Sequence, residues 1–378
     1  MPAPRLPVTL ITGFLGAGKT TLLNRLLRDP ALAGAAVLIN EFGEIGLDHL
    51  LVERVDEGVV LLSAGCLCCT IRGELVDTLR DLLERRGKES LPPFDRIIIE
   101  TTGLADPAPI LQSLTAHPDL AGALTLDGVV TLVDAVNGAS TLDNHPESVK
   151  QVAVADRLVL TKTDIAGDMA ALRERLARLN PAARLLIGAQ ADAAALIGLG
   201  PWSPDGRIAD IRAWLAADAV DPAHDHHHHH HGHHHHHGHD HAHDPHHAGQ
   251  DPHDRNRHDA RIRAFSLASN KAIAPGTLEM FLDLVRAKHG PDLLRYKGLV
   301  KLADNPARPV LLQGVQHVMH DPVRLAAWPD ADQRSRLVFI VRDIEPAVIE
   351  GLFAAFLGEP RLDAPDAAAL TDNPLALR

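Results

Sequence analysis

The sequence has few cysteines and few aromatic residues, and it lacks a long apolar run. Its three cysteines are too few, and odd in number, for a disulfide framework, which indicates a reducing compartment and therefore the cytoplasm. Aromatic residues make up 3% and the net charge is −12, so neither a base-stacking platform nor a basic nucleic-acid surface is expected. No stretch approaches the roughly 20 apolar residues that cross a bilayer, and the N-terminus does not have the pattern of a signal peptide. We expect no nucleic-acid partner and no membrane partner.

Short apolar runs alternate with helical patterns through the first two hundred residues. Strands that are apolar almost without break are typical of a parallel sheet covered on both faces. The alternation predicts an α/β fold with a doubly wound, mostly parallel sheet. The expected strands are residues 7–12, 35–40, 59–62, 95–100, 128–135 and 156–162. The expected helices are 20–28, 74–86 and 170–179.

A change of composition divides the chain. Residues 216–259 are mostly His, Asp, Gly and Pro, which offer little to bury and therefore predict a disordered linker. Beyond the linker, strand and helix patterns predict a smaller α/β (α+β) domain with an antiparallel sheet. Its expected strands are 261–267, 293–304, 309–320 and 336–343, and its expected helices are 277–290 and 347–358. The predicted organisation is a first domain at 1–215, the linker, a second domain at 260–358 and a loose tail at 359–378.

Residues 13–20, GFLGAGKT, match the phosphate-binding pattern G-x-x-x-x-G-K-[ST] between a predicted strand and a predicted helix. In such a loop the backbone N–H groups point at phosphate oxygens, and glycines permit the tight curl. Lys19 is expected to reach the β- and γ-phosphates, and Thr20 to bind Mg²⁺. A glycine-rich turn with a chance lysine is the alternative, and the flanking strand and helix argue against it. The expected nucleotide-binding residues here are Gly13, Gly16, Ala17, Gly18, Lys19, Thr20 and Thr21.

A second motif indicates which nucleotide binds. Residues 158–164, LVLTKTD, read as a strand that ends in T-K-T-D, close to the N-K-x-D motif of guanine-specific GTPases. Asp164 can accept hydrogen bonds from guanine N1–H and the 2-amino group, which adenine does not present. The stem of Lys162 can lie over the base, and Thr161, where Asn is usual, can donate a hydroxyl contact. The motif favours GTP over ATP.

Two further segments have the character of γ-phosphate sensors. Glu100 lies at the C-terminal end of the strand at 95–100 and can hold the Mg²⁺ shell, while the N–H of Gly103 can meet the γ-phosphate. The segment 40–48, NEFGEIGLD, has the position of a loop that orders around the γ-phosphate. Each carboxylate taken singly can equally belong to a solvated acidic loop. The expected catalytic residues are Lys19, Glu100 and Asp48; no Gln suited to orienting water is evident, so slow intrinsic hydrolysis is expected.

All three cysteines, Cys66, Cys68 and Cys69, lie within four positions. Structural cysteines are usually buried singly and would be scattered through a core, and a catalytic thiol needs only one cysteine with a base beside it. Clustered thiolates favour a soft metal, Zn²⁺ or Cu⁺, and C-x-C-C supplies at most three ligands, so a fourth must come from elsewhere or from water. Because the cluster lies between the two sensor segments, nucleotide state and metal affinity are expected to be coupled in both directions.

These motifs together resemble the CobW-type GTPases, which include zinc chaperones and proteins linked to cobalt delivery for cobalamin synthesis. The resemblance implies that Cys66, Cys68 and Cys69 bind the metal, most commonly Zn²⁺, with Co²⁺ as an alternative, and that GTP hydrolysis accompanies metal insertion into a client protein. Some relatives have an acidic residue near the metal where this chain has Ile39, so Glu41 or Glu44 is expected to supply the fourth ligand. The resemblance covers about 7–358, without the histidine tract, through GFLGAGKTTLLN (13–24), NEFGEIGLD (40–48), GCLCC (65–69), ETTGLADP (100–107), TKTD (161–164) and RYKG (295–298).

A histidine tract at 224–247 holds 17 of the 25 histidines. An internal tract mixed with Asp and Gly does not have the pattern of an expression tag, and a plain linker would be served by Gly and Ser. Neutral imidazoles bind Zn²⁺, Ni²⁺, Co²⁺ and Cu²⁺, so the tract predicts a reservoir of weak sites that raises the local metal concentration and weakens in acid. Its expected ligands include His226, His227, His228, His233 and His234.

Three functions are therefore weighed. The leading hypothesis is a GTPase metallochaperone that passes its metal to a client metalloprotein. A metal buffer that relies on the histidine tract is the second, and a P-loop kinase for a small molecule is the third, against which T-K-T-D argues. Arg295 and Lys297 of RYKG read equally as ordinary charges on a surface strand and as a functional patch.

Overall fold

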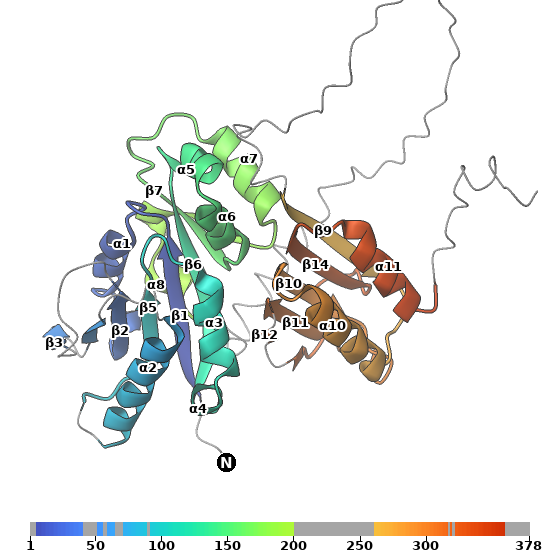
Figure 1. The fold of residues 1–378 in the computed structure, drawn as a ribbon, viewed down its shortest axis with the longest axis horizontal. Coiled ribbons are helices and arrows are strands. Elements are labelled where there is room, and N and C mark those ends of the chain that lie inside the picture. Colours follow the sequence, from blue (N-terminus) through green and yellow to red (C-terminus); the bar gives the residue numbers. More distant parts are fainter. Residues whose placement is uncertain are drawn as a thin grey trace, which may run out of the picture.

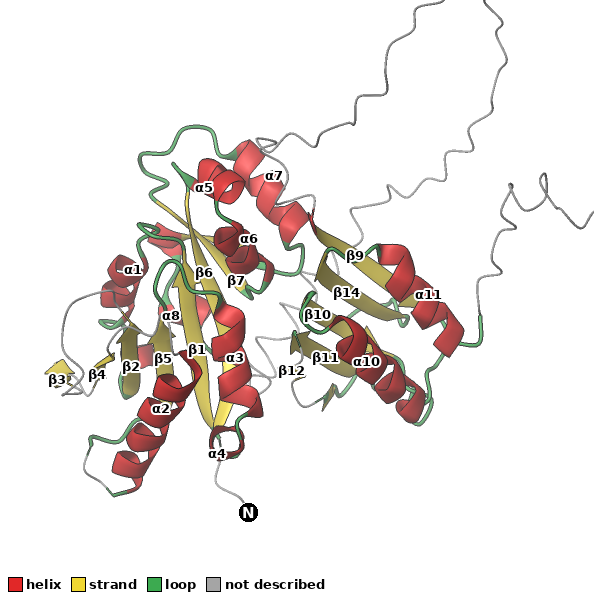
Figure 2. Cartoon of the chain, viewed as in Figure 1, coloured by secondary structure: helices red, strands yellow, loops and turns green. Residues whose placement is uncertain are grey.

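The computed structural model describes residues 5–40, 51–55, 59–64, 71–88, 91–199, 261–316, 318–319 and 322–359. They form two sheets with helices packed against them (Figures 1 and 2). The predictions for the cysteines, for the acidic segment after Asn40 and for the histidine tract lie outside the described residues. Among the helices described, none is long and apolar enough to cross a membrane.

The first sheet has the strand order β3-β4-β2-β5-β1-β6-β7-β8, and every neighbouring pair is parallel except β3 with β4. The central strand β6 is buried along its whole length, as its apolar sequence requires. The strands are β1 (Leu6–Gly13), β2 (Ala35–Asn40), β3 (Leu51–Val55), β4 (Val59–Ala64), β5 (Arg96–Glu100), β6 (Leu124–Asp134), β7 (Arg157–Thr161) and β8 (Arg184–Ile187).

Helices cover both faces of this sheet, and each face has its own apolar core. Side chains of α2 and α3 pack with strand residues in one cluster, whereas α1 and α8 pack in another on the opposite face (Figure 1). The helices are α1 (Lys19–Leu26), α2 (Ile71–Gly87), α3 (Pro107–Ala116), α4 (Pro118–Ala121), α5 (Gly138–Asn144), α6 (Pro146–Ala153), α7 (Ala170–Leu179) and α8 (Ala193–Leu196), with 3₁₀ turns at Pro30–Leu32 and Gly188–Gln190. The predicted doubly wound α/β fold is confirmed.

The second sheet is antiparallel, in the order β12-β11-β10-β14-β9, with β13 paired to β11. Helices α10 and α11 cover the face that lies away from the first sheet (Figure 1), over an aromatic core of Phe281, Phe339, Phe353 and Tyr296. The predicted antiparallel domain is confirmed. Its elements are β9 (Ile262–Ser269), α10 (Pro275–His289), β10 (Leu293–Val300), β11 (Val310–Val315), β12 (Val318–Met319), β13 (Val323–Arg324), β14 (Ser335–Arg342) and α11 (Pro346–Phe356).

Candidate functional site

The phosphate loop connects the end of β1 to the start of α1, as its sequence predicts. Gly13 has a φ of 141°, and a Cβ at this position would lie 2.5 Å from the carbonyl oxygen of Leu132 in β6. Gly16 and Gly18 also have positive φ values, in the region that favours glycine. The loop can therefore curl above the sheet only because these positions lack side chains.

Lys19 makes hydrogen bonds within the phosphate loop, and Thr20 joins the loop to the end of β5. Lys19 is buried, and its Nζ donates hydrogen bonds to the carbonyls of Gly13 at 2.8 Å and Phe14 at 3.3 Å. Thr20 donates its hydroxyl to Oε1 of Glu100, with an oxygen–oxygen distance of 2.8 Å. A hydroxyl and a buried carboxylate side by side are the hard oxygen donors that Mg²⁺ prefers, so these two residues fit a magnesium site.

Thr161, at the end of β7, ties this strand to the phosphate loop. Its hydroxyl donates to the carbonyl of Ala17 at 2.8 Å and lies 3.3 Å from the carbonyl of Val133. The sequence predicts a contact between Thr161 and the nucleotide, and that contact stays a prediction. In this structure the threonine fixes the distance between the phosphate loop and the T-K-T-D motif.

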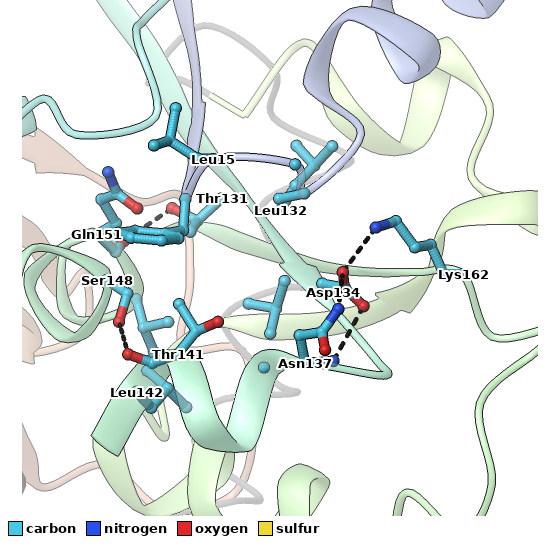
Figure 3. Close-up of a pocket in the computed structure, with 16 residues that line it drawn as sticks. Leu15, Thr131, Leu132, Asp134, Asn137, Thr141, Leu142, Ser148, Gln151 and Lys162 are labelled. Atoms are coloured by element: carbon cyan, nitrogen blue, oxygen red, sulfur yellow. Dashed lines mark hydrogen bonds and ion pairs between the residues drawn. The ribbon is translucent and has the colours of Figure 1, made fainter. Parts of the chain in front are cut away.

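Lys162 has a φ of 55° and forms an ion pair with Asp134 at the end of β6, with Nζ 2.7 Å from Oδ2 (Figure 3). Burial acts to raise the pKa of Asp134, but hydrogen bonds from Lys162, Asn137 and the N–H of Val136 outweigh it and hold the pKa below its ordinary value. Asp134 therefore stays ionised and holds the lysine, an interaction that the sequence analysis missed because the two residues are 28 positions apart.

Asp164 is exposed and makes no hydrogen bond or ion pair to any other described residue, so its carboxylate is available to accept from a base. The turn after β8 lies beside the end of β7, because the two strands are parallel neighbours and a Cβ on Gly188 would lie 3.5 Å from the side chain of Thr161. Arg25 of α1 fixes this turn by donating to the carbonyls of Gly188, Ala189 and Ala191. The role of Arg25 could not be predicted from the sequence, since nothing in the residues around it distinguishes it from an ordinary surface arginine of a helix.

A cavity of about 270 Å³ lies behind the phosphate loop, between β6 and helices α5 and α6 (Figure 3). Leu15 and Gln151 border one side of it, and Asp134 and Lys162 border the other. The ring of Phe14, also at its wall, stacks on His145 with centroids 4.3 Å apart. The outer face of the loop is therefore backed by side chains of α5 and α6 as well as by the sheet.

The segment after β5 packs directly on the phosphate loop. A Cβ on Gly103 would lie 2.5 Å from the backbone nitrogen of Leu15, so this residue must be glycine for the approach to occur. Thr101 donates its hydroxyl to Thr12 at 2.9 Å, which fastens the start of the segment to β1. The structure thus brings the predicted sensor Gly103 beside the phosphate loop.

The RYKG sequence of β10 contacts the first domain. Arg295 and Lys297 both form ion pairs with Asp156, which immediately precedes β7. Only 4% of the Arg295 side chain and 11% of the Lys297 side chain are exposed, so the alternative of ordinary charges on a surface strand is wrong. Burial lowers the pKa of Lys297, while for Asp156 the two cations outweigh burial and hold its pKa well below the ordinary value.

Strand register relates the cysteine segment to the phosphate loop. In β2, Ile39 pairs with Ser63 of β4 on one side and with Glu100 of β5 on the other. The chain therefore leaves β4, at Ala64, at the carboxyl end of the parallel strands, which is the end of the sheet where Glu100 contacts Thr20. Within the described part of the chain no group of three or more His, Cys, Asp or Glu side chains is placed to hold a metal ion.

Two family descriptions match the chain. The first, "CobW/HypB/UreG, nucleotide-binding domain", matches residues 7–186. The second, "Cobalamin synthesis protein cobW C-terminal domain", matches residues 262–357. They correspond to the parallel sheet and to the antiparallel sheet.

Individual relatives extend this similarity over most of the chain. A zinc chaperone, CobW, of Pseudomonas aeruginosa is 32% identical over 91% of this chain and 90% of its own length. The zinc chaperone YjiA of Escherichia coli is 47% identical over 46% of this chain and 54% of its own length. The crystal structure of Zn(II)-bound YjiA GTPase from E. coli superposes with a TM-score of 0.63 at 29% identity, covering 93% of this chain and 99% of that one.

Proposed function

This chain belongs to the CobW family of P-loop GTPases, and from this premise we propose that it is a GTP-dependent zinc chaperone. In this proposal Cys66, Cys68 and Cys69 carry Zn²⁺ as cargo, and GTP hydrolysis accompanies its transfer to a client metalloprotein. The single observation that carries the proposal is the strand register: the chain enters the cysteine segment at Ala64, on the sheet edge where Glu100 meets the phosphate loop.

The nucleotide half of the proposal rests on the loop geometry. Lys19 is positioned over the loop, and Thr20 with Glu100 would hold Mg²⁺, which neutralises charge on the phosphate oxygens when bound. Asp164 would select guanine, and the turn at Gly188–Gln190, fixed by Arg25, would border the base. Support for zinc comes from the relatives named zinc chaperones, while the cobalamin name of the second domain supports Co²⁺ as the alternative cargo.

A metal buffer that depends on the histidine tract is the competing function, and one pair of variants separates the two. We expect deletion of residues 224–247 to remove the weak sites and to leave one tightly bound Zn²⁺, because thiolates are stronger zinc ligands than scattered imidazoles. Replacement of Cys66 by Ser in the full chain should abolish the tight site. Binding isotherms with a zinc chelator measure both; loss of nearly all binding on deletion of the tract would instead support the buffer.

A further inference from the structure

Gln151 is a fully buried polar side chain beside the candidate nucleotide site. It lies on α6, its exposed fraction is 0%, and its side chain borders the cavity behind the phosphate loop (Figure 3). Its Nε2 donates to the carbonyl of Gly103 at 3.1 Å and to the carbonyl of Ala105 at 3.0 Å. Both amide protons are therefore used on the segment that follows β5.

The other atom of this amide is not satisfied. Oε1 of Gln151 is buried and has no hydrogen-bond partner within the described residues. A buried acceptor without a partner opposes folding, since its hydration is lost and not replaced. The two donated hydrogen bonds of the glutamine therefore come with a cost that a methionine of similar size would not have.

The two acceptor carbonyls belong to the segment that must stay against the phosphate loop. Gly103 approaches Leu15 so closely that a side chain at 103 would clash with the backbone of Leu15. The neighbouring carboxylate of Asp106, which caps α3, pairs with Lys150 of α6 at 2.9 Å. Residues 103–106 are therefore held from one side by the phosphate loop and from the other by α6.

Helix α6 is itself fixed at its far end. The carbonyl of Val154, just past the helix, accepts a hydrogen bond from Arg295 of β10. On its inner side the backbone carbonyl of Gln151 accepts from the hydroxyl of Thr131 in β6 at 2.7 Å (Figure 3). The helix is consequently a rigid support for the glutamine side chain rather than a loose surface element.

We propose that Gln151 is a positioning residue for the γ-phosphate contact: by holding the carbonyls of Gly103 and Ala105, it keeps the N–H of Gly103 turned toward the nucleotide. This inference rests on the proposed binding of GTP and is independent of zinc transfer. Since GDP has no γ-phosphate, the expected signature of Gln151 is a preference for GTP over GDP.

The test replaces the amide by groups of the same size. Gln151→Met removes both donors at every pH. Gln151→Glu removes them when ionised but restores one donor when protonated. Fluorescent-nucleotide titration measures the ratio of the GDP dissociation constant to that of a non-hydrolysable GTP analogue. We expect this ratio to fall about tenfold in the Met variant at all pH values. In the Glu variant we expect the same fall at pH 8 and partial recovery at pH 5.5.

Charged and titratable groups surround this position, so each variant is read against the wild type at each pH. They are Glu147 and Lys150 on α6, Asp106 on the adjoining segment, and His145, Asp134 and Lys162 around the cavity. The half-buried Gln313 of β11 provides a matched control, because Gln313→Glu makes the same chemical change far from the loop and should leave the ratio unchanged. Thermal unfolding with GDP bound shows whether each variant is folded; if Gln151→Glu is not, the Met variant alone decides.

A ratio equal to the wild type in folded Gln151→Met would overturn the inference and leave the proposed function intact. A similar loss of GTP and GDP affinity would also overturn it, since that is what a general disturbance of the domain produces. Failure of the wild-type chain to bind a GTP analogue would overturn the proposed function and this inference together.

Discussion

In the proposed site, single side chains would decide which nucleotide binds. Asp164 stands exposed at the end of β7, while its neighbours Thr161 and Lys162 are committed to Ala17 and Asp134. Because Thr161 and Lys162 stabilise the end of the strand, Asp164 is the residue of the motif that remains to contact a base. Base selection should therefore depend on one carboxylate.

We predict that Asp164→Asn weakens GTP binding by about 10- to 100-fold, because the amide keeps one acceptor oxygen and loses one of two hydrogen bonds to a charged group, which contribute about 1.5–3 kcal/mol each. Xanthosine triphosphate, which has a carbonyl in place of the 2-amino group, should bind the variant better than GTP does. Competition titrations with the two nucleotides measure this. Asp168→Asn, in the same loop, keeps its backbone cap on Ala170 and should bind GTP as the wild type does; an equal loss in both variants would contradict the assignment.

The residue-level motifs were also the most predictable part of the site. GFLGAGKT and T-K-T-D are local patterns, and the structure places the loop glycines at positive φ and joins Thr20 to Glu100. Gln151, Asp134 and Arg25 could not be found in this way. Their partners lie 46, 28 and 164 positions away in sequence, and no local spacing records such contacts.

At the scale of elements, helices α1 and α6 brace the loops on either side of the nucleotide site. Arg25 of α1 holds the turn after β8, and Gln151 of α6 holds the segment after β5. Both turns connect a parallel strand to a helix and would otherwise be fixed only by their ends. The helices that surround the site thus stabilise the conformation of its loops, in addition to any direct contact with the nucleotide.

We predict that Arg25→Ala lowers affinity for GTP and GDP alike, by about tenfold, because the turn at 188–191 loses hydrogen bonds of about 0.5–1.5 kcal/mol each and borders the base rather than the γ-phosphate. Isothermal titration with each nucleotide would measure the change. Arg28→Ala, an exposed arginine just after the same helix, serves as the control. A selective loss of GTP over GDP would contradict this role for Arg25.

Strand prediction succeeded where the apolar pattern was continuous and failed where it was not. The six predicted strands of the first sheet are present, because burial on both faces demands uninterrupted apolar residues. β3 (LVERV) and β8 (RLLI) were missed: the first carries two charges and the second has only four residues, and both are edge strands. Edge strands have fewer buried positions and therefore leave a weaker signal.

For the whole molecule, the contact between the two sheets combines apolar packing with a buried carboxylate. Asp156 lies between two cations of β10 and also accepts the N–H of Val129 at 3.0 Å. It stands at the start of β7, the strand that ends in the guanine motif. The second domain is thereby fastened to the strand that ends in T-K-T-D.

We predict that Asp156→Asn destabilises the chain by about 3–5 kcal/mol, since the change leaves two buried cations without their counter-charge. The pKa of Asp156 is depressed in the folded state, so its contribution is present above the unfolded value near 4 and is lost as the pH falls through the folded value. Urea unfolding at pH 7 and at pH 3 would measure both effects, with a smaller difference between variant and wild type in acid.

Asp292→Asn is the matched control for this prediction. Asp292 pairs with Arg342 within the second domain, but both side chains are partly exposed, so the pair should contribute no more than about 1 kcal/mol. Equal destabilisation by the two variants at pH 7 would show that the buried cluster does not fasten the domains.

The proposed function requires that nucleotide binding changes the affinity of the whole molecule for Zn²⁺. The most direct measurement is the Zn²⁺ dissociation constant, by competition with a chelator, of a chain lacking residues 224–247, with and without a non-hydrolysable GTP analogue. We predict constants that differ by about 5–150-fold, the usual range of coupling between two linked sites, with a reciprocal effect of Zn²⁺ on GTP affinity. Equal constants would contradict it.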